Sequence, residues 1–172
     1  PSVCIEPFTV LQLDISDPAT HSVAEAMQRF SLPEYLDDYA ATGVATKTCQ
    51  IEEAPRVLVI QLMRFSYTAT GHSLKLTKEC SIPDRLCITK ETLVPGHPSS
   101  SAGSGGVEYD LLATISHHGH SLQNGHYTAS VKDHQTGDWF HCDDEDIRVQ
   151  SHSHSHTGLK SSDVYLVIYR KV

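Results

Sequence analysis

The sequence predicts an α+β domain in which a mainly antiparallel β-sheet is joined by short helices near the N-terminus. Strand-like runs rich in β-branched and aromatic residues recur through the chain, and four of them follow one another closely after residue 106. Two helix-start signatures lie before residue 35. A length of 172 residues fits a single domain with a moderate core.

The first elements are expected to be one strand and two helices. Residues 8–15 alternate apolar and polar side chains, as a half-buried strand does. A serine followed three residues later by a glutamate, the spacing of a capping box, precedes residues 23–30 and again residues 35–40. This spacing predicts a short helix over each range, with Asp37 and Asp38 on the exposed face of the second.

The middle of the chain contains the expected core strand. Residues 56–65, RVLVIQLMRF, are almost continuously apolar, which suits a strand buried on both faces. Shorter strands are expected over residues 73–76 and 86–89. Gly, Pro and Ser dominate from about residue 95 to 107, and SHSHSHTG fills residues 151–158, so both segments are predicted to be flexible surface loops.

Four further strands are predicted over residues 109–116, 127–132, 139–142 and 164–169, and their close spacing indicates antiparallel pairing, in a sheet of about six strands. The turn between the second and third of these is centred near Gln135.

This hairpin brings an imidazole to a carboxylate. Paired residues of an antiparallel hairpin have a nearly constant sum of sequence numbers, so His126 is expected opposite Asp143 or Asp144. A carboxylate that accepts a proton from one ring nitrogen leaves the other nitrogen as a base. Gly125 allows a substrate backbone to pass close to His126. The arrangement suits the general base of a protease.

Composition excludes several other classes of protein. A formal net charge of -8 without a long basic cluster argues against a nucleic-acid surface. No stretch approaches the roughly 20 apolar residues of a membrane span. Five scattered cysteines without a CxxC pair favour reduced thiols and hence the cytosol or the nucleus. The chain begins at Pro1, which suggests a piece of a longer polypeptide.

Several motifs, in order along the chain, resemble those of ubiquitin-specific proteases, the papain-like cysteine enzymes that release ubiquitin from lysines and from precursors. The string GHYT, Trp139 and the pair of aspartates are similar to the histidine and aspartate boxes of that family. Other matching motifs are EPF at residues 6–8, P-x-VLVIxLxRF at 55–65, Lys75 with Leu76, and YLVIY at 165–169. The branch containing ubiquitin carboxyl-terminal hydrolase 10 is the most similar.

The resemblance implies a fold and a set of roles. The fold would be the palm subdomain of a papain-like cysteine proteinase. His126 would be the general base, Asp143 the acid that orients it, and Asp144 an auxiliary polar group. Gly125, Tyr127 and His118 would contact the substrate. The implied partners are ubiquitin and ubiquitinated proteins, with no cofactor, nucleic acid or membrane.

The sequence also departs from the family pattern. The N-terminal G-N-T-C-Y-type box that carries the nucleophile is absent, and none of the five cysteines replaces it. Residues 43–48 stand where many members have the second CxxC pair of a zinc site, so no structural zinc is expected. We therefore expect the chain alone to be catalytically silent, with the cysteine supplied by a missing N-terminal lobe.

Other interpretations remain open at this point. The chain could be a non-catalytic ubiquitin-binding remnant, or an unrelated β-rich binding domain. His117, His118 and His120 are expected in a loop before Leu122, where they either border the channel for the ubiquitin tail or are simply exposed to solvent. Trp139 is an anchor for packing or a contact for substrate. The tract with His152, His154 and His156 is low-complexity sequence or, less simply, a metal ligand set.

Overall fold

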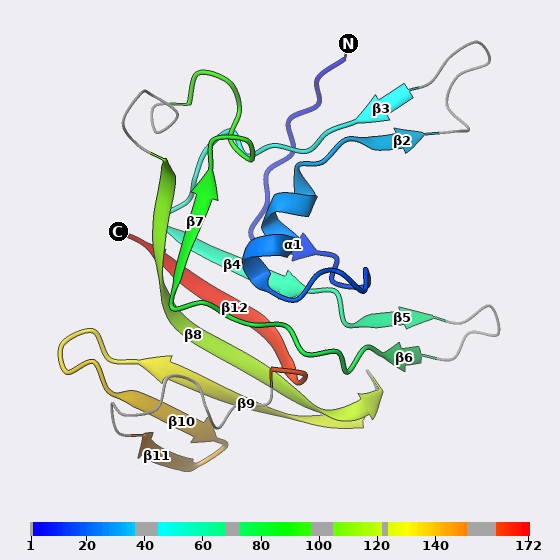
Figure 1. The fold of residues 1–172 in the computed structure, drawn as a ribbon. Helices are drawn as coiled ribbons and strands as arrows, with labels where there is room; N and C mark the ends of the chain where they lie inside the picture. The colour runs from blue at the N-terminus through cyan, green and yellow to red at the C-terminus, as the bar shows by residue number, and fades with distance from the viewer. Residues whose placement is uncertain (1, 37–44, 68–72, 98–104, 122–123, 151–160) are drawn as a thin grey trace.

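A twisted, mainly antiparallel sheet dominates the computed structural model, which describes residues 2–36, 45–67, 73–97, 105–121, 124–150 and 161–172. The sheet has eight strands in the order β1-β4-β12-β8-β9-β10-β11, with β7 also paired to β8 (Figure 1). The strands are β1 (Leu11–Leu13), β4 (Val57–Leu62), β7 (Arg85–Thr89), β8 (Gly106–Ser121), β9 (Asn124–Lys132), β10 (Trp139–Asp143), β11 (Asp146–Gln150) and β12 (Val164–Lys171). Only β1 and β4 are parallel among these pairs, so the predicted antiparallel sheet is confirmed.

Helix α1 (Val23–Phe30) forms where the first capping box predicts it. The side chain of Ser22 accepts a hydrogen bond from the backbone N–H of Glu25 at 3.1 Å, and Glu25 accepts one from the backbone N–H of His21 at 2.6 Å. These bonds satisfy backbone donors that a helix N-terminus leaves open. Val23 and Met27 are buried on the face of the helix that covers the sheet.

The second predicted helix is wrong over the residues that can be compared. Strand β2 (Glu34–Leu36) pairs instead with β3 (Ala45–Lys47), and residues 37–44 lie outside the described part. Ser31 ends α1: its backbone N–H and its hydroxyl both donate to the carbonyl of Gln28. Because this serine closes one helix, it does not begin another.

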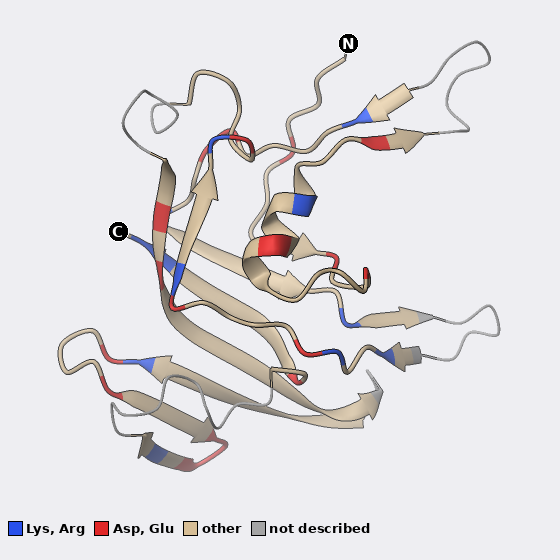
Figure 2. Cartoon of the chain, viewed as in Figure 1, with Lys and Arg blue, Asp and Glu red and all other residues tan. Residues whose placement is uncertain are grey.

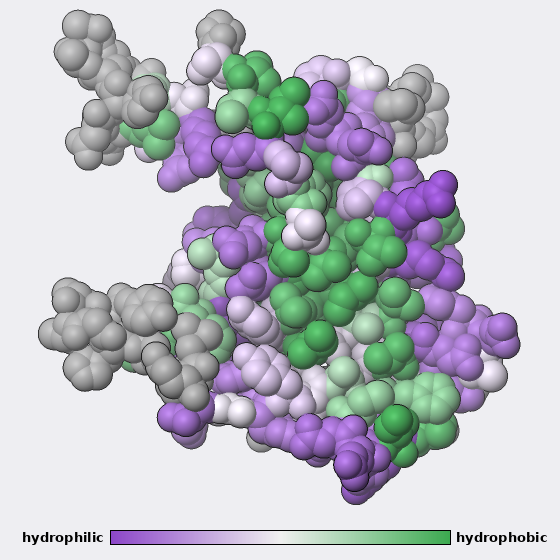
Figure 3. Space-filling view, turned by 180° about the vertical axis from the view of Figure 1, so that it is seen from behind, coloured by the Kyte–Doolittle hydropathy of each residue, from purple (hydrophilic) through white to green (hydrophobic). Residues whose placement is uncertain are grey.

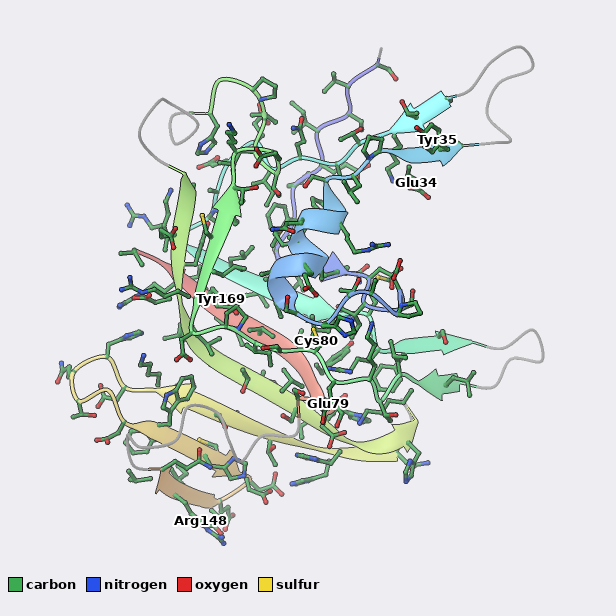
Figure 4. The ribbon with its side chains drawn as sticks, in the orientation of Figure 1. Glu34, Tyr35, Glu79, Cys80, Arg148 and Tyr169 are labelled. Atoms are coloured by element: carbon green, nitrogen blue, oxygen red, sulfur yellow. The ribbon has the colours of Figure 1, made fainter. Side chains whose placement is uncertain are left out.

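The core lies between α1 and one face of the sheet. Leu58, Ile60 and Leu62 of β4 point into this layer with no exposed surface. Cys80 and Tyr169, both fully buried, occupy the same layer (Figure 4). The prediction that both faces of β4 are fully buried is wrong, because Val57 on the other face is 48% exposed.

The opposite face of the sheet has a continuous apolar row that crosses six strands. Each member is the direct cross-strand partner of the next. The members are Val59, Ile168, Ala113, Val131, Phe140 and Val149. We call this set the apolar row. It contributes to the broad hydrophobic surface seen from behind in Figure 3, and Val149 at its end is 62% exposed.

The remaining comparisons with the prediction concern strand ends, strands that were not expected and the two loops. Only Leu11–Leu13 of the predicted strand 8–15 is regular, and β8 extends through Ser121 where a loop was expected. Strand β11 was not predicted. A two-stranded ribbon, β5 (Phe65–Tyr67) with β6 (Ser73–Lys75), follows β4. Of the two predicted loops, residues 106–107 belong to β8, while 98–104 and 151–158 fall outside the described residues.

No helix in the described ranges has the length and apolar character needed to cross a membrane.

Candidate active site

The side chains of His126 and Asp143 meet at the end of the β9–β10 hairpin. Nε2 of His126 and Oδ1 of Asp143 are in hydrogen-bond contact, and the two side chains are 48% and 47% exposed. An ionised carboxylate can only accept, so the shared proton belongs to Nε2. Nδ1 is then the nitrogen that can take a proton from another group.

The strand register differs slightly from the prediction. Backbone bonds between Asp133 and Asp138 and between Gly137 and Asp133 close a loop whose centre lies just after Gln135. Cys142 consequently pairs with Ala129. Asp143 is therefore diagonal to His126 and not directly opposite it. Diagonal neighbours on one face of a sheet remain within reach of long side chains, so the predicted contact still forms.

The surroundings of His126 favour its protonated form. The pKa of His126 is raised, chiefly by the hydrogen bond and the charge of Asp143, with a smaller contribution from the charge of Asp144. Partial desolvation opposes the shift. A base of this kind gains a proton more readily than a free imidazole and holds it beside a carboxylate.

Asp144 begins the turn from β10 to β11, where acidic residues gather (Figure 2). Its φ of 51° is left-handed, a conformation that aspartate tolerates better than most residues. One ligand atom each from His126, Asp143 and Asp144 lies within 4.8 Å of the others. The direct contact between His126 and Asp143 leaves no room for an ion between those two ligands. The absence of a bound metal stays a prediction.

His118 is the direct cross-strand partner of His126 on β8, not a residue of a loop. The two rings are nearly parallel, with centroids 6.4 Å apart and an interplanar angle of 28°. Nε2 of His118 lies 2.9 Å from Oγ1 of Thr128, and Nδ1 lies 3.6 Å from Oδ2 of Asp163. Both ring nitrogens of His118 therefore face groups of the protein itself.

Gly125 is required by a contact within the chain. A Cβ atom at this position would lie 2.0 Å from Nε2 of His117, a distance that no side chain could occupy. Tyr127 is 49% exposed, and its ring centroid lies 4.9 Å from that of His117. The suggested substrate contacts of Gly125, Tyr127 and His118 stay predictions.

His117 is a residue whose place the sequence did not reveal. It is 1% exposed, in contact with the rings of Phe65 and Tyr127, and its Nδ1 has no hydrogen-bond partner among the residues that the structure describes. Burial lowers the pKa of His117, and the charge of Lys75 lowers it further. Alternation along β8 could have separated this histidine from exposed His118, had the strand been extended that far.

The comparisons identify relatives over nearly all of the chain. A sequence model described as "Ubiquitin carboxyl-terminal hydrolase" matches residues 9–169. The chain is 39% identical over 164 residues to a probable ubiquitin carboxyl-terminal hydrolase 3 of Schizosaccharomyces pombe, covering 93% of this chain and 31% of that protein. It is 33% identical over 175 residues to ubiquitin carboxyl-terminal hydrolase 10-A of Xenopus laevis, covering 99% and 22%.

Solved structures give the same result. A SAGA DUB module of Ubp8, Sgf11, Sus1 and Sgf73 bound to monoubiquitin has a chain with a TM-score of 0.83 and 28% identity, covering 100% of this chain and 37% of that one. Another module, bound to ubiquitin aldehyde, gives 0.78 and 26%, covering 98% and 37%. The chain thus spans less than two fifths of these relatives. The predicted α+β, papain-like fold is confirmed, and the chain belongs to the ubiquitin carboxyl-terminal hydrolase family, where it matches part of the catalytic domain of ubiquitin-specific proteases.

Proposed function

We propose that this chain supplies the general-base part of a thiol-dependent ubiquitin carboxyl-terminal hydrolase. The observation that carries the proposal is the contact between His126 and Asp143 within a fold of this family. His126 takes the proton of a cysteine thiol, and Asp143 holds the ring and stabilises the imidazolium. Asp144 adds negative charge at the same turn.

The chemistry follows from these roles. Nδ1 of His126 accepts the thiol proton, and the thiolate attacks the carbonyl of the isopeptide bond between the ubiquitin C-terminus and a lysine. The imidazolium then returns its proton to the leaving amine, and a thioester remains on the cysteine. Water, deprotonated by the same imidazole, hydrolyses the thioester and releases both ubiquitin and the free thiol.

None of the five cysteines, all of them within the described residues, is hydrogen-bonded to His126, and three have further features that do not suit a nucleophile. Cys80 is fully buried, and burial raises its pKa. Burial and the neighbouring Glu108 raise the pKa of Cys87 to about 11. Cys142 directly precedes Asp143, so its side chain points to the opposite face of β10. Since a nucleophilic thiol needs a lowered pKa and contact with its base, the attacking sulfur comes from another polypeptide segment.

The substrate class follows from the relatives. Two of the solved neighbours are bound to monoubiquitin and to ubiquitin aldehyde. We assign this chain the same ligand, with Gly125 and exposed Tyr127 beside the path of the ubiquitin tail. Ubiquitinated proteins in the cytosol or nucleus would be the substrates, and the chemistry requires no cofactor.

A second candidate is a ubiquitin-binding domain without catalysis. It is favoured because His126 has its hydrogen bond with Asp143 and none with the five cysteines, which all lie within the described residues. The two functions differ in one respect: the first requires a polypeptide that delivers a thiolate to His126, and the second requires only binding.

The test uses ubiquitin with an electrophilic C-terminal group, followed by mass spectrometry. We expect the chain alone to bind ubiquitin, seen as shifts in an NMR titration, but to show no labelled cysteine. In the longer protein, a cysteine outside this chain should be labelled, and His126→Ala should abolish both labelling and hydrolysis of a ubiquitin C-terminal amide. Labelling of any of the five cysteines contradicts the proposed division of the site. Wild-type activity of His126→Ala in the longer protein removes the base assignment.

A further inference from the structure

A second imidazole–carboxylate pair lies beside the first. His118 is held by Oγ1 of Thr128 at 2.9 Å from its Nε2 and by Oδ2 of Asp163 at 3.6 Å from its Nδ1. Thr128 is only 5% exposed, so its hydroxyl is a fixed partner. With Nε2 at hydrogen-bond distance from Thr128 and Nδ1 facing the Asp163 carboxylate, the His118 ring has a defined orientation although 43% of its side chain is exposed.

The carboxylate behind His118 is itself fixed. Nζ of Lys75 lies 2.7 Å from Oδ1 of Asp163, and the Lys75 side chain is 3% exposed. The same ammonium group also donates to the backbone carbonyl of His117. The charge of Lys75 and the hydrogen bond from it lower the pKa of Asp163, although desolvation opposes this, and Asp163 therefore stays ionised. This partly buried pair connects β6, β8 and the residue before β12.

The His126 ring has fewer constraints of its own. Its side chain is 48% exposed, and its hydrogen bond to Asp143 is a single contact at one nitrogen. An imidazole held at one atom can still rotate about its side-chain torsions. On the β8 side, the nearly parallel ring of His118 restricts this rotation.

We propose that His118, fixed by Thr128 and by the Asp163–Lys75 pair, is a positioning residue that confines the His126 ring against Asp143. Both ring nitrogens of His118 face groups of the protein itself, whereas the sequence predicted that His118 would contact the substrate. The consequence for catalysis rests on the proposed function, because it requires His126 to be the base. The confinement itself does not depend on that function.

An alternative effect of His118 would be purely electrostatic, and it has the opposite sign. The charges that act on His126 are those of Asp143 and Asp144, at the end of β10 and in the turn after it, and Asp163 and Lys75 lie behind His118. If His118 acted only as a nearby positive charge, its removal would raise the pKa of His126. If it confines the ring, its removal weakens the contact with Asp143 and lowers the pKa of His126.

The experiment is an NMR titration of the histidine rings in this chain, without ubiquitin, so it is independent of any catalytic activity. Wild type is compared with His118→Ala and Thr128→Val, and His120→Ala is the control because His120 is exposed on the same strand. Both test variants should lower the pKa of His126 by several tenths of a unit and weaken ring contacts to Asp143. The control should change neither.

His118→Phe completes the set because it keeps a flat ring without a charge. If the ring of residue 118 confines His126, the pKa of His126 in His118→Phe should lie closer to the wild-type value than the pKa of His126 in His118→Ala. An unchanged or raised pKa of His126 in His118→Ala, with native backbone spectra, would overturn the inference. If His118→Ala does not fold, Thr128→Val and His118→Phe decide the question by the same comparison. Failure to bind ubiquitin would leave this result intact and count only against the proposed function.

Discussion

Arg64 is predicted to be one of the most important single residues for the stability of this chain. Its side chain is 1% exposed and donates to four backbone carbonyls, those of Val164, Leu76, Lys78 and Ser161. These carbonyls belong to two segments that are distant in sequence, residues 76–78 after β6 and residues 161–164 at the start of β12. One guanidinium therefore holds β12 to the chain that follows β6.

Arg64→Met keeps much of the side-chain volume and removes every donor. The carbonyl of Val164 is bonded in a buried environment, and the other three are partly buried. A buried acceptor without a partner costs about 1–3 kcal/mol, and partly buried ones cost less because water can reach them. The sum is about 4 kcal/mol, after allowance for the desolvation that Arg64 no longer suffers. A domain has about 5–15 kcal/mol in total, so the loss is large.

The assay is urea unfolding followed by the fluorescence of Trp139, the single tryptophan. With a slope of about 2 kcal/mol per molar urea, the midpoint should fall by about 2 M. Arg148→Met is the matched control, because Arg148 projects from β11 into solvent with 75% of its side chain exposed (Figure 4). Its midpoint should change by less than about 0.3 M. Equal shifts in the two variants would refute the reasoning.

Three further predictions concern the site. Asp143→Asn should lower the pKa of His126 toward its ordinary value in an NMR titration, because the acceptor charge is lost; an unchanged pKa would contradict the pairing. Gly125→Ala should destabilise the chain by about 1–3 kcal/mol in thermal unfolding, since the new methyl group meets the buried His117 ring, and adding His117→Ala should recover part of the loss. The pKa of His117 is lowered in the fold, so the unfolded chain binds its proton first, and stability should fall as the pH drops below about 6.5. His126, whose pKa is raised, contributes in the opposite direction, and His117→Phe should reduce the acid sensitivity if the assignment is right.

Sequence patterns predicted those elements whose stabilising hydrogen bonds lie between residues close together in the chain. The capping box at Ser22 and Glu25 is satisfied by hydrogen bonds within one turn, so α1 could be read directly. The same spacing at Ser31 was misleading, because the serine already closes α1. Strand β11 was missed although its five residues, Asp146–Gln150, alternate polar and apolar side chains as a strand does.

One contact of the site could also be predicted from a local pattern, and another could not. His126 and Asp143 are joined by a short hairpin, so their proximity follows from the turn and survives a small error in register. Asp163 and Lys75 are separated by most of the C-terminal half of the chain, and their contact depends on β6 and β12 both lying beside β8. A sequence contains no local sign of such a contact, which is why the support for His118 became visible only in three dimensions.

The apolar row has a practical consequence for work with this polypeptide. Exposure of apolar surface to water is unfavourable, so two copies of the protein can lower their free energy by burying the apolar row between them. Preparations should therefore change in scattering mass with concentration, and hydrophobic dyes should bind to them even when the fold is intact. A charged replacement of Val149, the member of the row at the outermost strand, should keep titrations with ubiquitin in the monomeric regime without disturbing His126.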